Sequence, residues 1–333
     1  MTIQPTPLRY LSADDVLAAL PPVEERLVLA RRTMLALVAD AELPPKIGVH
    51  PRSAASFGHA MPAYLRGSAA DGSDDLLGMK WVVGVPGNTA LGMPAIHGTV
   101  LMSDARTGLP RGVLDAGPIT AHRTAAVSGV AIEHWAPDPA DRALRIGLVG
   151  AGIQGRSHLA VLAHLLPGST LVIHDRDAGR AGALAAEAED TGAFDAIATV
   201  ERAVEAIEGA DVVVTLVSFG PDRQAVPLSA WAPDVTVVAV DYDMCVPAAV
   251  AAEAALFLVD DRGQFLANRT DAVFRGYPEP GATMGEALLA GTARPARGRV
   301  LVTHLGVGLA DVVFGDALLQ AAAAQGLGKI LPR

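Results

Sequence analysis

Residues 145–155 read Arg-Ile-Gly-Leu-Val-Gly-Ala-Gly-Ile-Gln-Gly, and this stretch decides the fold class. Its first five residues predict a buried strand, and helical spacing follows over residues 154–166. Gly150, Gly152 and Gly155 form the pattern GxGxxG between the two. The first glycine permits a tight turn, the second lets backbone approach a pyrophosphate, and the third allows close packing of helix on strand. The combination predicts a dinucleotide-binding turn.

An acidic residue, Asp175, follows the next predicted strand, 20 positions after Gly155. A carboxylate there accepts hydrogen bonds from a ribose 2′-OH and repels a 2′-phosphate, which favours NAD over NADP. Arg176 and Arg180 are close enough in sequence to bind a 2′-phosphate instead, so NADP stays an alternative. The candidate cofactor contacts are Gly150, Gly152, Ile153, Gln154, Gly155, Asp175, Arg176 and Thr124.

The pattern of the chain changes around this turn. The predicted strands 145–149, 170–174, 211–217 and 236–240 alternate with the predicted helices 154–166, 178–191 and 200–209. Such alternation is typical of βαβ units in a doubly wound parallel sheet. Residues 47–117 show short apolar runs broken by glycine and proline, which predict an antiparallel or mixed sheet. Helical spacing covers residues 23–39, 120–135 and 315–325, and Ser12–Asp15 reads as a capping box.

Composition bounds the class of protein. The chain has 333 residues, of which 51% are hydrophobic and 19% charged, so it is long enough for about two domains with sizeable cores. A net charge of −10 argues against nucleic-acid binding. One cysteine, no signal-peptide pattern and no apolar run long enough to span a bilayer lead us to expect a cytoplasmic protein without a membrane partner. CxxC and HExxH are absent, so no metal site is expected.

Lysine is rare: of 26 basic residues only Lys46, Lys80 and Lys329 are lysines. A lysine that remains in such a chain is a candidate for a role that the fixed, planar guanidinium of arginine does not fill. Lys80 lies within an apolar predicted strand, 78–83. Because burial of an unpaired ammonium is costly, we expect Lys80 to meet an anion, either a ligand or a structural ion-pair partner.

Three further places offer chemistry. Arg123, in a run of small residues, either clamps a carboxylate or is an exposed helix charge. Asp241 and Asp243 follow a predicted strand of the parallel sheet, and in extended chain they share one face, with a hydrated turn as the alternative. The glycines of His304–Gly308 either bring backbone close to a cofactor or form an ordinary turn. Cys245 is interpreted as a small buried hydrophobe.

The chain resembles the ornithine cyclodeaminase/mu-crystallin family over nearly its whole length. The residues that carry the resemblance are Met61–Leu65, Gly78–Trp81, Pro86–Asn88, Arg123–Ala126, the glycine turn, Met284–Glu286 and Leu305–Asp311. The resemblance implies a substrate and dimerisation domain of α+β type built from residues 1–125 and 303–333. A Rossmann domain, residues 126–302, is inserted between these parts. It also implies a homodimer and action on amino or imino acids with a nicotinamide cofactor.

Carried over residue by residue, Lys80 matches the substrate lysine of the family and Arg123 its carboxylate-binding arginine. Lys46 lies where an arginine commonly binds the same carboxylate. Asp243 aligns best with the catalytic aspartate of the family, with Asp241 as the alternative. The chain departs from the family where the turn 241–247 lacks the usual glycines. It departs again where His59 lies near the place of the glutamate that the cyclodeaminases carry before Met-Pro.

The residues and the resemblance together predict an oxidoreductase dependent on NAD, or alternatively NADP. Its substrate is the C–N bond at the α-carbon of an amino acid or its imine. Lys46, Arg123 and His59 are expected to hold the substrate, Lys80 to polarise the carboxylate or relay a proton, and Asp243 to act as acid or base. Two alternatives are a cyclodeaminase that releases ammonia and recycles NAD internally, and a non-catalytic cofactor-binding protein.

Overall fold

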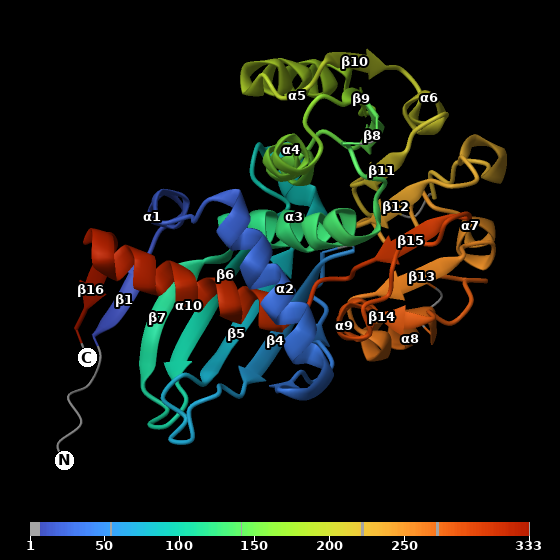
Figure 1. The fold of residues 1–333 in the computed structure, drawn as a ribbon. Helices are drawn as coiled ribbons and strands as arrows, with labels where there is room; N and C mark the ends of the chain where they lie inside the picture. The colour runs from blue at the N-terminus through green and yellow to red at the C-terminus, as the bar shows by residue number, and fades with distance from the viewer. Residues whose placement is uncertain (1–6, 54, 141, 221–222, 271–272, 333) are drawn as a thin grey trace. The chain divides into compact units, whose positions relative to one another are not determined.

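The computed structural model describes residues 7–53, 55–140, 142–220, 223–270 and 273–332. The chain divides into two compact units, which we call the terminal unit (Met1–Arg123 and Gly306–Arg333) and the central unit (Thr124–Leu305). In Figure 1 the terminal unit carries the blue, cyan and red colours and the central unit the green to orange ones. The domain boundaries expected from the sequence, 125/126 and 302/303, lie two and three residues from these divisions.

The terminal unit contains a mixed sheet, as residues 47–117 predicted. Its strands are β1 (Leu8–Leu11), β2 (Ala41–Glu42), β3 (Ile47–Val49), β4 (Phe57–Leu65), β5 (Leu76–Gly84), β6 (Ile96–Asp104), β7 (Pro110–Asp115) and β16 (Lys329–Leu331). The order is β16-β1-β7-β6-β5-β4-β2, and β3 also pairs with β4. β1 pairs parallel with β7 and antiparallel with β16. Strands from the two ends of the sequence therefore belong to one sheet.

Helices cover this sheet. They are α1 (Ala13–Ala18), α2 (Val23–Ala39), the first part of α3 (Ala116–Trp135) and α10 (Gly308–Gln325), with a 3-10 turn at Pro86–Leu91. Ser12 caps α1 in the predicted capping box. Helix α10 crosses β4, β5 and β6 and packs against α2, which crosses it obliquely (Figure 1). It begins at Gly308, seven residues before the predicted start. A Cβ at residue 308 would lie 2.5 Å from the Met61 carbonyl oxygen, so the glycine lets this end of the helix lie close to β4.

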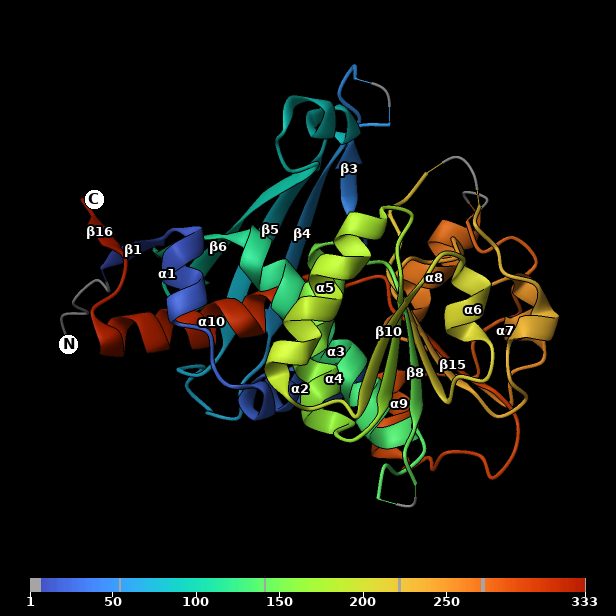
Figure 2. The same cartoon turned by 90° about the horizontal axis from the view of Figure 1, so that it is seen from above.

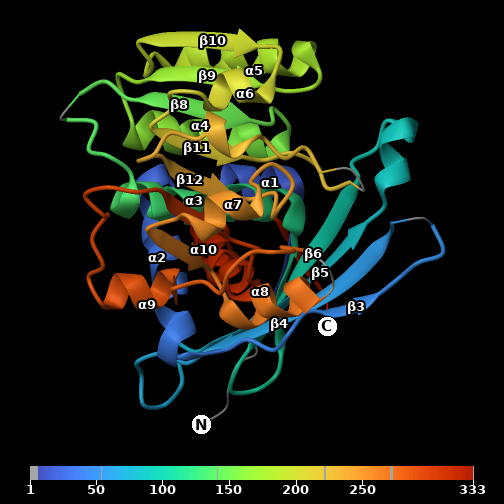
Figure 3. The same ribbon diagram turned by 90° about the vertical axis from the view of Figure 1, so that its right-hand side faces the viewer.

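The central unit is a doubly wound parallel sheet, which confirms the predicted fold class. Its strands are β8 (Arg145–Val149), β9 (Thr170–His174), β10 (Ala196–Val200), β11 (Val212–Thr215), β12 (Thr236–Ala239), β13 (Leu256–Val259), β14 (Ala282–Thr283) and β15 (Val300–Thr303). They lie in the order β10-β9-β8-β11-β12-β15-β13-β14. Figure 3 shows the succession from β10 through β9, β8 and β11 to β12, and Figure 1 labels β15, β13 and β14. The order reverses beside β8, and ligands of such sheets bind at the carboxyl ends of the strands near that reversal.

Helices lie on both faces of the parallel sheet. They are α4 (Ile153–Leu165), α5 (Ala178–Thr191), α6 (Ala203–Ile207), α7 (Ala248–Ala252), α8 (Arg262–Thr270) and α9 (Met284–Leu289), with a 3-10 turn at Leu228–Ala230. Figure 2 shows α4 and α5 on one face and α6, α7 and α8 on the other. The predicted helix 200–209 is wrong at its start, since Val200 ends β10, an exposed edge strand that was not predicted.

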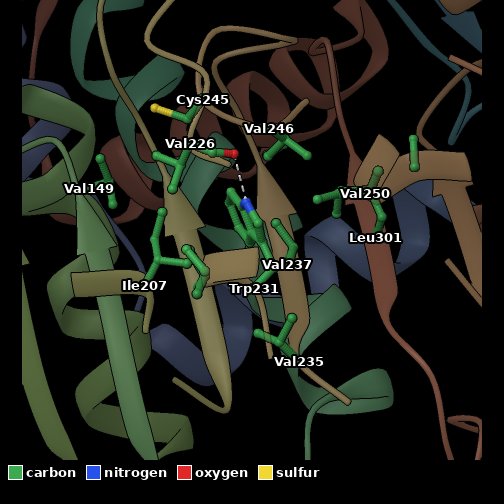
Figure 4. Close-up of a cluster of buried hydrophobic side chains, with 14 of the residues drawn as sticks. Val149, Ile207, Val226, Trp231, Val235, Val237, Cys245, Val246, Val250 and Leu301 are labelled. Atoms are coloured by element: carbon green, nitrogen blue, oxygen red, sulfur yellow. Dashed lines mark hydrogen bonds between the residues drawn. The ribbon is translucent and has the colours of Figure 1, made fainter. Parts of the chain in front are cut away.

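A hydrophobic cluster fills the central unit between the sheet and α6, α7 and α8. Trp231, 2% exposed, donates its indole N–H to the carbonyl oxygen of Val226 at 3.1 Å (Figure 4). Cys245 packs in the same cluster with no exposed surface, as the sequence interpretation expected. Burial raises the pKa of its thiol. Within the described ranges no helix is both long and apolar enough to cross a bilayer.

Candidate active site

The glycine turn joins β8 to α4, as predicted. Gly150 has φ 114°, and a Cβ there would lie 2.7 Å from the Leu216 carbonyl oxygen. A Cβ at Gly155 would lie 2.4 Å from the Gly150 carbonyl oxygen. A Cβ at Gly152 would meet no atom of the described residues within 4 Å. The first and third glycines are therefore required by the fold itself, while the second leaves open space in front of the turn.

This open space lies at the N-terminus of α4. The first backbone bond of the helix runs from the N–H of Arg156 to the carbonyl oxygen of Gly152 at 3.1 Å. The N–H groups of residues 153–155 precede that bond, and such groups, together with the helix dipole, stabilise an anion. Ile153 is 67% exposed at the same point. The turn fits the pyrophosphate of a dinucleotide.

Asp175 lies beside the turn, because β9 pairs with β8 and ends at His174. One carboxylate oxygen accepts the N–H of Ala151 at 2.8 Å, and the other accepts the N–H of Asp177 at 2.9 Å. Each oxygen retains a further lone pair, so both can still accept hydroxyl groups of a ribose. Arg176 is exposed next to it.

The remaining cofactor candidates are arranged differently. Thr124, at the start of the central unit, is buried within α3 at 4% exposure. Arg180 is paired through its Nε with Asp177 at 3.5 Å. This pairing directs the positive charge of Arg180 toward the carboxylate that caps α5.

The terminal unit holds a buried charge cluster of Lys80, Arg123 and Asp311. Lys80 Nζ lies 2.7 Å from one oxygen of Asp311, and Arg123 Nε lies 3.1 Å from the other. The three residues are 2%, 5% and 0% exposed. Alternation along β5 places Lys80 on the face that packs against α10, the helix that carries Asp311. The expectation that Lys80 meets an anion is confirmed, and Arg123 is not an exposed helix charge.

The charges of this cluster do not balance. Two cations share one carboxylate, so the three side chains together carry a net charge of +1. Desolvation lowers the pKa of Lys80 to about 8 although Asp311 opposes the shift, and the positive charges of Arg123 and Lys46 lower it further. Thr120 accepts a hydrogen bond from Lys80 Nζ at 3.5 Å. Excess positive charge in a buried place is relieved by binding an anion.

The glycines of the segment 304–308 serve this cluster. Gly306 has φ 80°, and a Cβ there would lie 2.8 Å from Arg123 Nη1. The missing side chain lets the guanidinium lie against the backbone. Within the terminal unit, these glycines thus make room for Arg123 and for the contact of Gly308 with Met61.

Lys46 and His59 lie near the cluster on the β3–β4 ladder. Lys46 immediately precedes β3, and Gly48 of β3 pairs with His59 of β4. The His59 ring is half-buried and stacked on Phe57, with ring centroids 4.6 Å apart. Desolvation lowers the pKa of His59, and the charge of Lys46 lowers it further. The structure therefore brings Lys46 within electrostatic reach of both His59 and Lys80.

In the central unit, Asp241 is buried at the carboxyl end of β12, 1% exposed. One of its oxygens accepts the hydroxyl of Thr215 at 2.7 Å, and the other accepts the N–H of Val217 at 3.2 Å. Burial raises the pKa of Asp241 to about 6. These contacts tie the end of β12 to the last residue of β11 and to the segment that follows it.

Asp243 has a separate environment. One oxygen lies 3.0 Å from Arg223 Nε and the other accepts the N–H of Phe274 at 3.0 Å, and the side chain is 12% exposed. The expectation that Asp241 and Asp243 share a face of extended chain is wrong, because Tyr242 between them has φ 60° and turns the backbone. Asp243 is the more accessible of the two carboxylates.

Asp311 was not among the residues selected from the sequence. Its signal was an acidic residue in the first turn of a mostly apolar helix, together with the need of Lys80 for an anion. Neither signal predicts by itself that Asp311 contacts Lys80, since the two residues lie on elements far apart in the sequence.

A doubly wound parallel sheet with a GxGxxG turn at the start of α4 is the arrangement of Rossmann-type dinucleotide-binding domains. The chain belongs to the ornithine cyclodeaminase/mu-crystallin family, whose sequence profile matches residues 13–231. It is 32% identical over 332 residues to the nodulation efficiency protein NfeD of Rhizobium meliloti, covering 98% of each chain.

Solved structures show the same fold. The Δ1-pyrroline-2-carboxylate reductase of Thermococcus litoralis, in complex with NADH and L-proline, is 23% identical. Its TM-score is 0.83, with 97% of this chain and 100% of that chain covered. An archaeal alanine dehydrogenase dimer with bound NAD is also 23% identical. Its TM-score is 0.84, with 98% and 99% covered.

Proposed function

We propose that this protein is a nicotinamide-dependent oxidoreductase that interconverts an amino acid and its imine at the α-carbon. The observation that carries the proposal is the buried cluster of Lys80, Arg123 and Asp311 with its net positive charge. A carboxylate is the anion common to proline and alanine, the amino acids in the names of the two structural relatives. In both, the carboxylate is attached to the carbon that bears the nitrogen.

In this proposal the substrate carboxylate binds Lys80 and Arg123, with Lys46 and His59 nearby. Arginine offers two parallel N–H donors to a carboxylate, which fixes the orientation of the substrate as well as its position. Because the pKa of Lys80 is about 8, its ammonium is charged at neutral pH yet able to release a proton. Lys80 therefore polarises the carboxylate or relays a proton.

Asp243 is proposed as the acid or base at the substrate nitrogen. When an imine is reduced, Asp243 in its protonated form gives the nitrogen its proton; in the reverse direction its carboxylate takes a proton from the ammonium. The nicotinamide, when bound, supplies or accepts the hydride that completes the change at the α-carbon. Asp243 is chosen over Asp241 because its side chain is 12% exposed, whereas Asp241 is buried.

The glycine turn and Asp175 are proposed to bind NAD in preference to NADP. The support is the carboxylate of Asp175 beside the turn, which accepts hydroxyls and repels a 2′-phosphate. We further propose a homodimer, which the dimeric archaeal relative supports. The lone cysteine supports a cytoplasmic location.

The test is a panel of amino acids, and of α-imino acids or α-keto acids with amines, followed at the NADH absorbance. A net change in NADH with one of these substrates supports the oxidoreductase. Ammonia release without net change in NADH identifies a cyclodeaminase instead. Binding of NADH with no turnover on any substrate identifies a cofactor-binding protein.

Two substitutions then test the assigned residues. Asp243→Asn and Lys80→Met are expected to abolish turnover while NADH binding persists, because neither residue belongs to the glycine turn. Asp241→Asn is the matched variant for Asp243→Asn. Wild-type rates in both Asp243→Asn and Lys80→Met overturn the assignment. Loss of turnover confined to Asp241→Asn moves the acid–base role to Asp241.

A further inference from the structure

A buried hydrogen-bond chain in the central unit has no place in the proposed chemistry. Ser128 of α3 lies between two imidazoles: its hydroxyl oxygen is 2.8 Å from Nε2 of His158 in α4 and 2.8 Å from Nε2 of His304, which follows β15. The three residues are 0%, 0% and 1% exposed. Polar groups buried so completely are retained where their hydrogen bonds hold a specific arrangement.

The direction of each bond follows from its chemistry. His158 Nδ1 lies 2.7 Å from the carbonyl oxygen of Gln154, which only accepts, so Nδ1 carries a proton. In a neutral ring the other nitrogen then accepts, and it takes the single hydroxyl proton of Ser128. The Ser128 oxygen in turn accepts from Nε2 of His304. A charged His158 is disfavoured at this depth by the cost of desolvation.

The chain therefore runs from His304 through Ser128 and His158 to the carbonyl of Gln154. That carbonyl lies in the first turn of α4 and also accepts the hydroxyl of Ser157 at 3.0 Å. It belongs to the peptide group whose N–H is that of Gly155. Hydrogen bonds at a carbonyl polarise its amide and strengthen the N–H as a donor. The Gly155 N–H is one of the groups at the N-terminus of α4 that precede the first helical bond.

We propose that His304, Ser128 and His158 form a positioning relay that fixes and polarises the Gln154–Gly155 peptide for a dinucleotide pyrophosphate. Because all three side chains are buried, we assign their effect to cofactor affinity and not to the reacting atoms. The inference rests on the proposed function only for the identity of the ligand. The tautomer of His158 is a property of the protein alone.

The first test is spectroscopic. In the full chain labelled with 15N-histidine, the His158 resonances, assigned with a His158→Asn variant, are expected to show the neutral Nδ1–H tautomer. In Ser128→Ala the Nε2 shift of His158 is expected to change, because its donor is gone. A neutral Nε2–H tautomer, or a doubly protonated ring at neutral pH, overturns the relay.

The second test is binding of NADH, ADP-ribose and adenosine by titration. Loss of one hydrogen bond of the ordinary net strength corresponds to roughly a 2- to 13-fold change in affinity. Ser128→Ala is expected to weaken NADH and ADP-ribose by such a factor and to leave adenosine, which has no pyrophosphate, unchanged. Ser128→Thr keeps the hydroxyl and is expected to retain more affinity than Ser128→Ala.

Ser169→Ala is the matched control. Ser169 is fully buried in the same unit, and among the described residues its hydroxyl makes no hydrogen bond. It is expected to bind all three ligands as the wild type does. If folded Ser128→Ala binds NADH and ADP-ribose with unchanged affinity, the relay is refuted while the proposed function stands. If the wild-type protein binds no NADH, the proposed function fails, and the pyrophosphate role of the relay with it.

Discussion

Asp311→Asn is the substitution that tests the buried charge cluster most directly. It keeps the shape of the side chain and removes the charge that Lys80 and Arg123 share. Two buried cations then face each other without a carboxylate. Removing one partner of a buried pair costs about 3–5 kcal/mol of unfolding free energy. For a unit of this size, that corresponds to a fall in Tm of roughly 6–20 °C.

Lys80→Met is the comparison. It leaves Arg123 and Asp311 as a balanced pair and removes an ammonium whose burial is costly, so we expect a loss under ~2 kcal/mol. The direction of the Tm change in the double variant can then be predicted. Because the ammonium repels Arg123 once Asp311 is neutral, Lys80→Met in the Asp311→Asn background is expected to raise Tm. Thermal unfolding of the four proteins, followed by circular dichroism, measures each value and the coupling energy.

Two outcomes of these Tm measurements would refute the assigned role of Asp311. If Asp311→Asn unfolds at the wild-type temperature, Asp311 is not the counter-ion of the cluster. If the double variant is less stable than Asp311→Asn by the full cost of Lys80→Met alone, Lys80 and Asp311 are energetically independent and the net charge of the cluster is irrelevant.

Three further predictions concern the two binding regions. Because Lys80 is protonated below a pKa of about 8 and binds the carboxylate in that form, kcat/KM is expected to fall toward tenfold per pH unit above pH 8. A profile that shows no fall between pH 8 and pH 10 contradicts this role. Asp175→Asn removes the charge that repels a 2′-phosphate. In a titration with both cofactors, the ratio of NADPH to NADH affinity should therefore rise roughly tenfold, about 1.4 kcal/mol. An unchanged ratio would show that Asp175 does not determine the preference for NADH over NADPH. Gly152→Ala should keep the wild-type Tm and lose NADH affinity, because its Cβ meets open space among the described residues. Gly155→Ala should lose both Tm and NADH affinity, because its Cβ would lie 2.4 Å from a carbonyl oxygen. Equal Tm losses in the two variants would contradict the different roles given to these glycines.

Local pattern predicted the central unit well, because its elements are defined by neighbouring residues. The glycine turn, Asp175 and the strand before each are set by spacing within about thirty residues, and the parallel order follows from their alternation. The edge strand β10, Ala196–Val200, is short and mostly exposed, and its last residue was assigned to the predicted helix 200–209, so the strand was not predicted. The turn at Tyr242 was not predicted for another reason. Glycine and asparagine are the residues that usually indicate a left-handed backbone conformation, and tyrosine does not.

The charge cluster of Lys80, Arg123 and Asp311 could be predicted only in part, because its contacts depend on the tertiary fold. The apolar surroundings of Lys80 predicted an anion, yet its identity depends on a residue brought there by the tertiary fold. Arg123 and Asp311 are separated by 188 positions, and no spacing rule spans that interval. For the glycines of 304–308 the sequence left two alternatives open, close approach to a cofactor or an ordinary turn. Gly308 instead begins α10, and its missing side chain lets the helix approach Met61.

The division of the terminal unit between two separated segments has a consequence for synthesis. Residues 306–332, which supply α10, β16 and Asp311, are translated only after the entire central unit. During translation, Lys80 and Arg123 are therefore synthesised before Asp311, and their charges stay solvated by water until Asp311 is present. The nucleotide-binding unit can close its own core during that interval, and arrival of α10 brings both cations out of water in one late step.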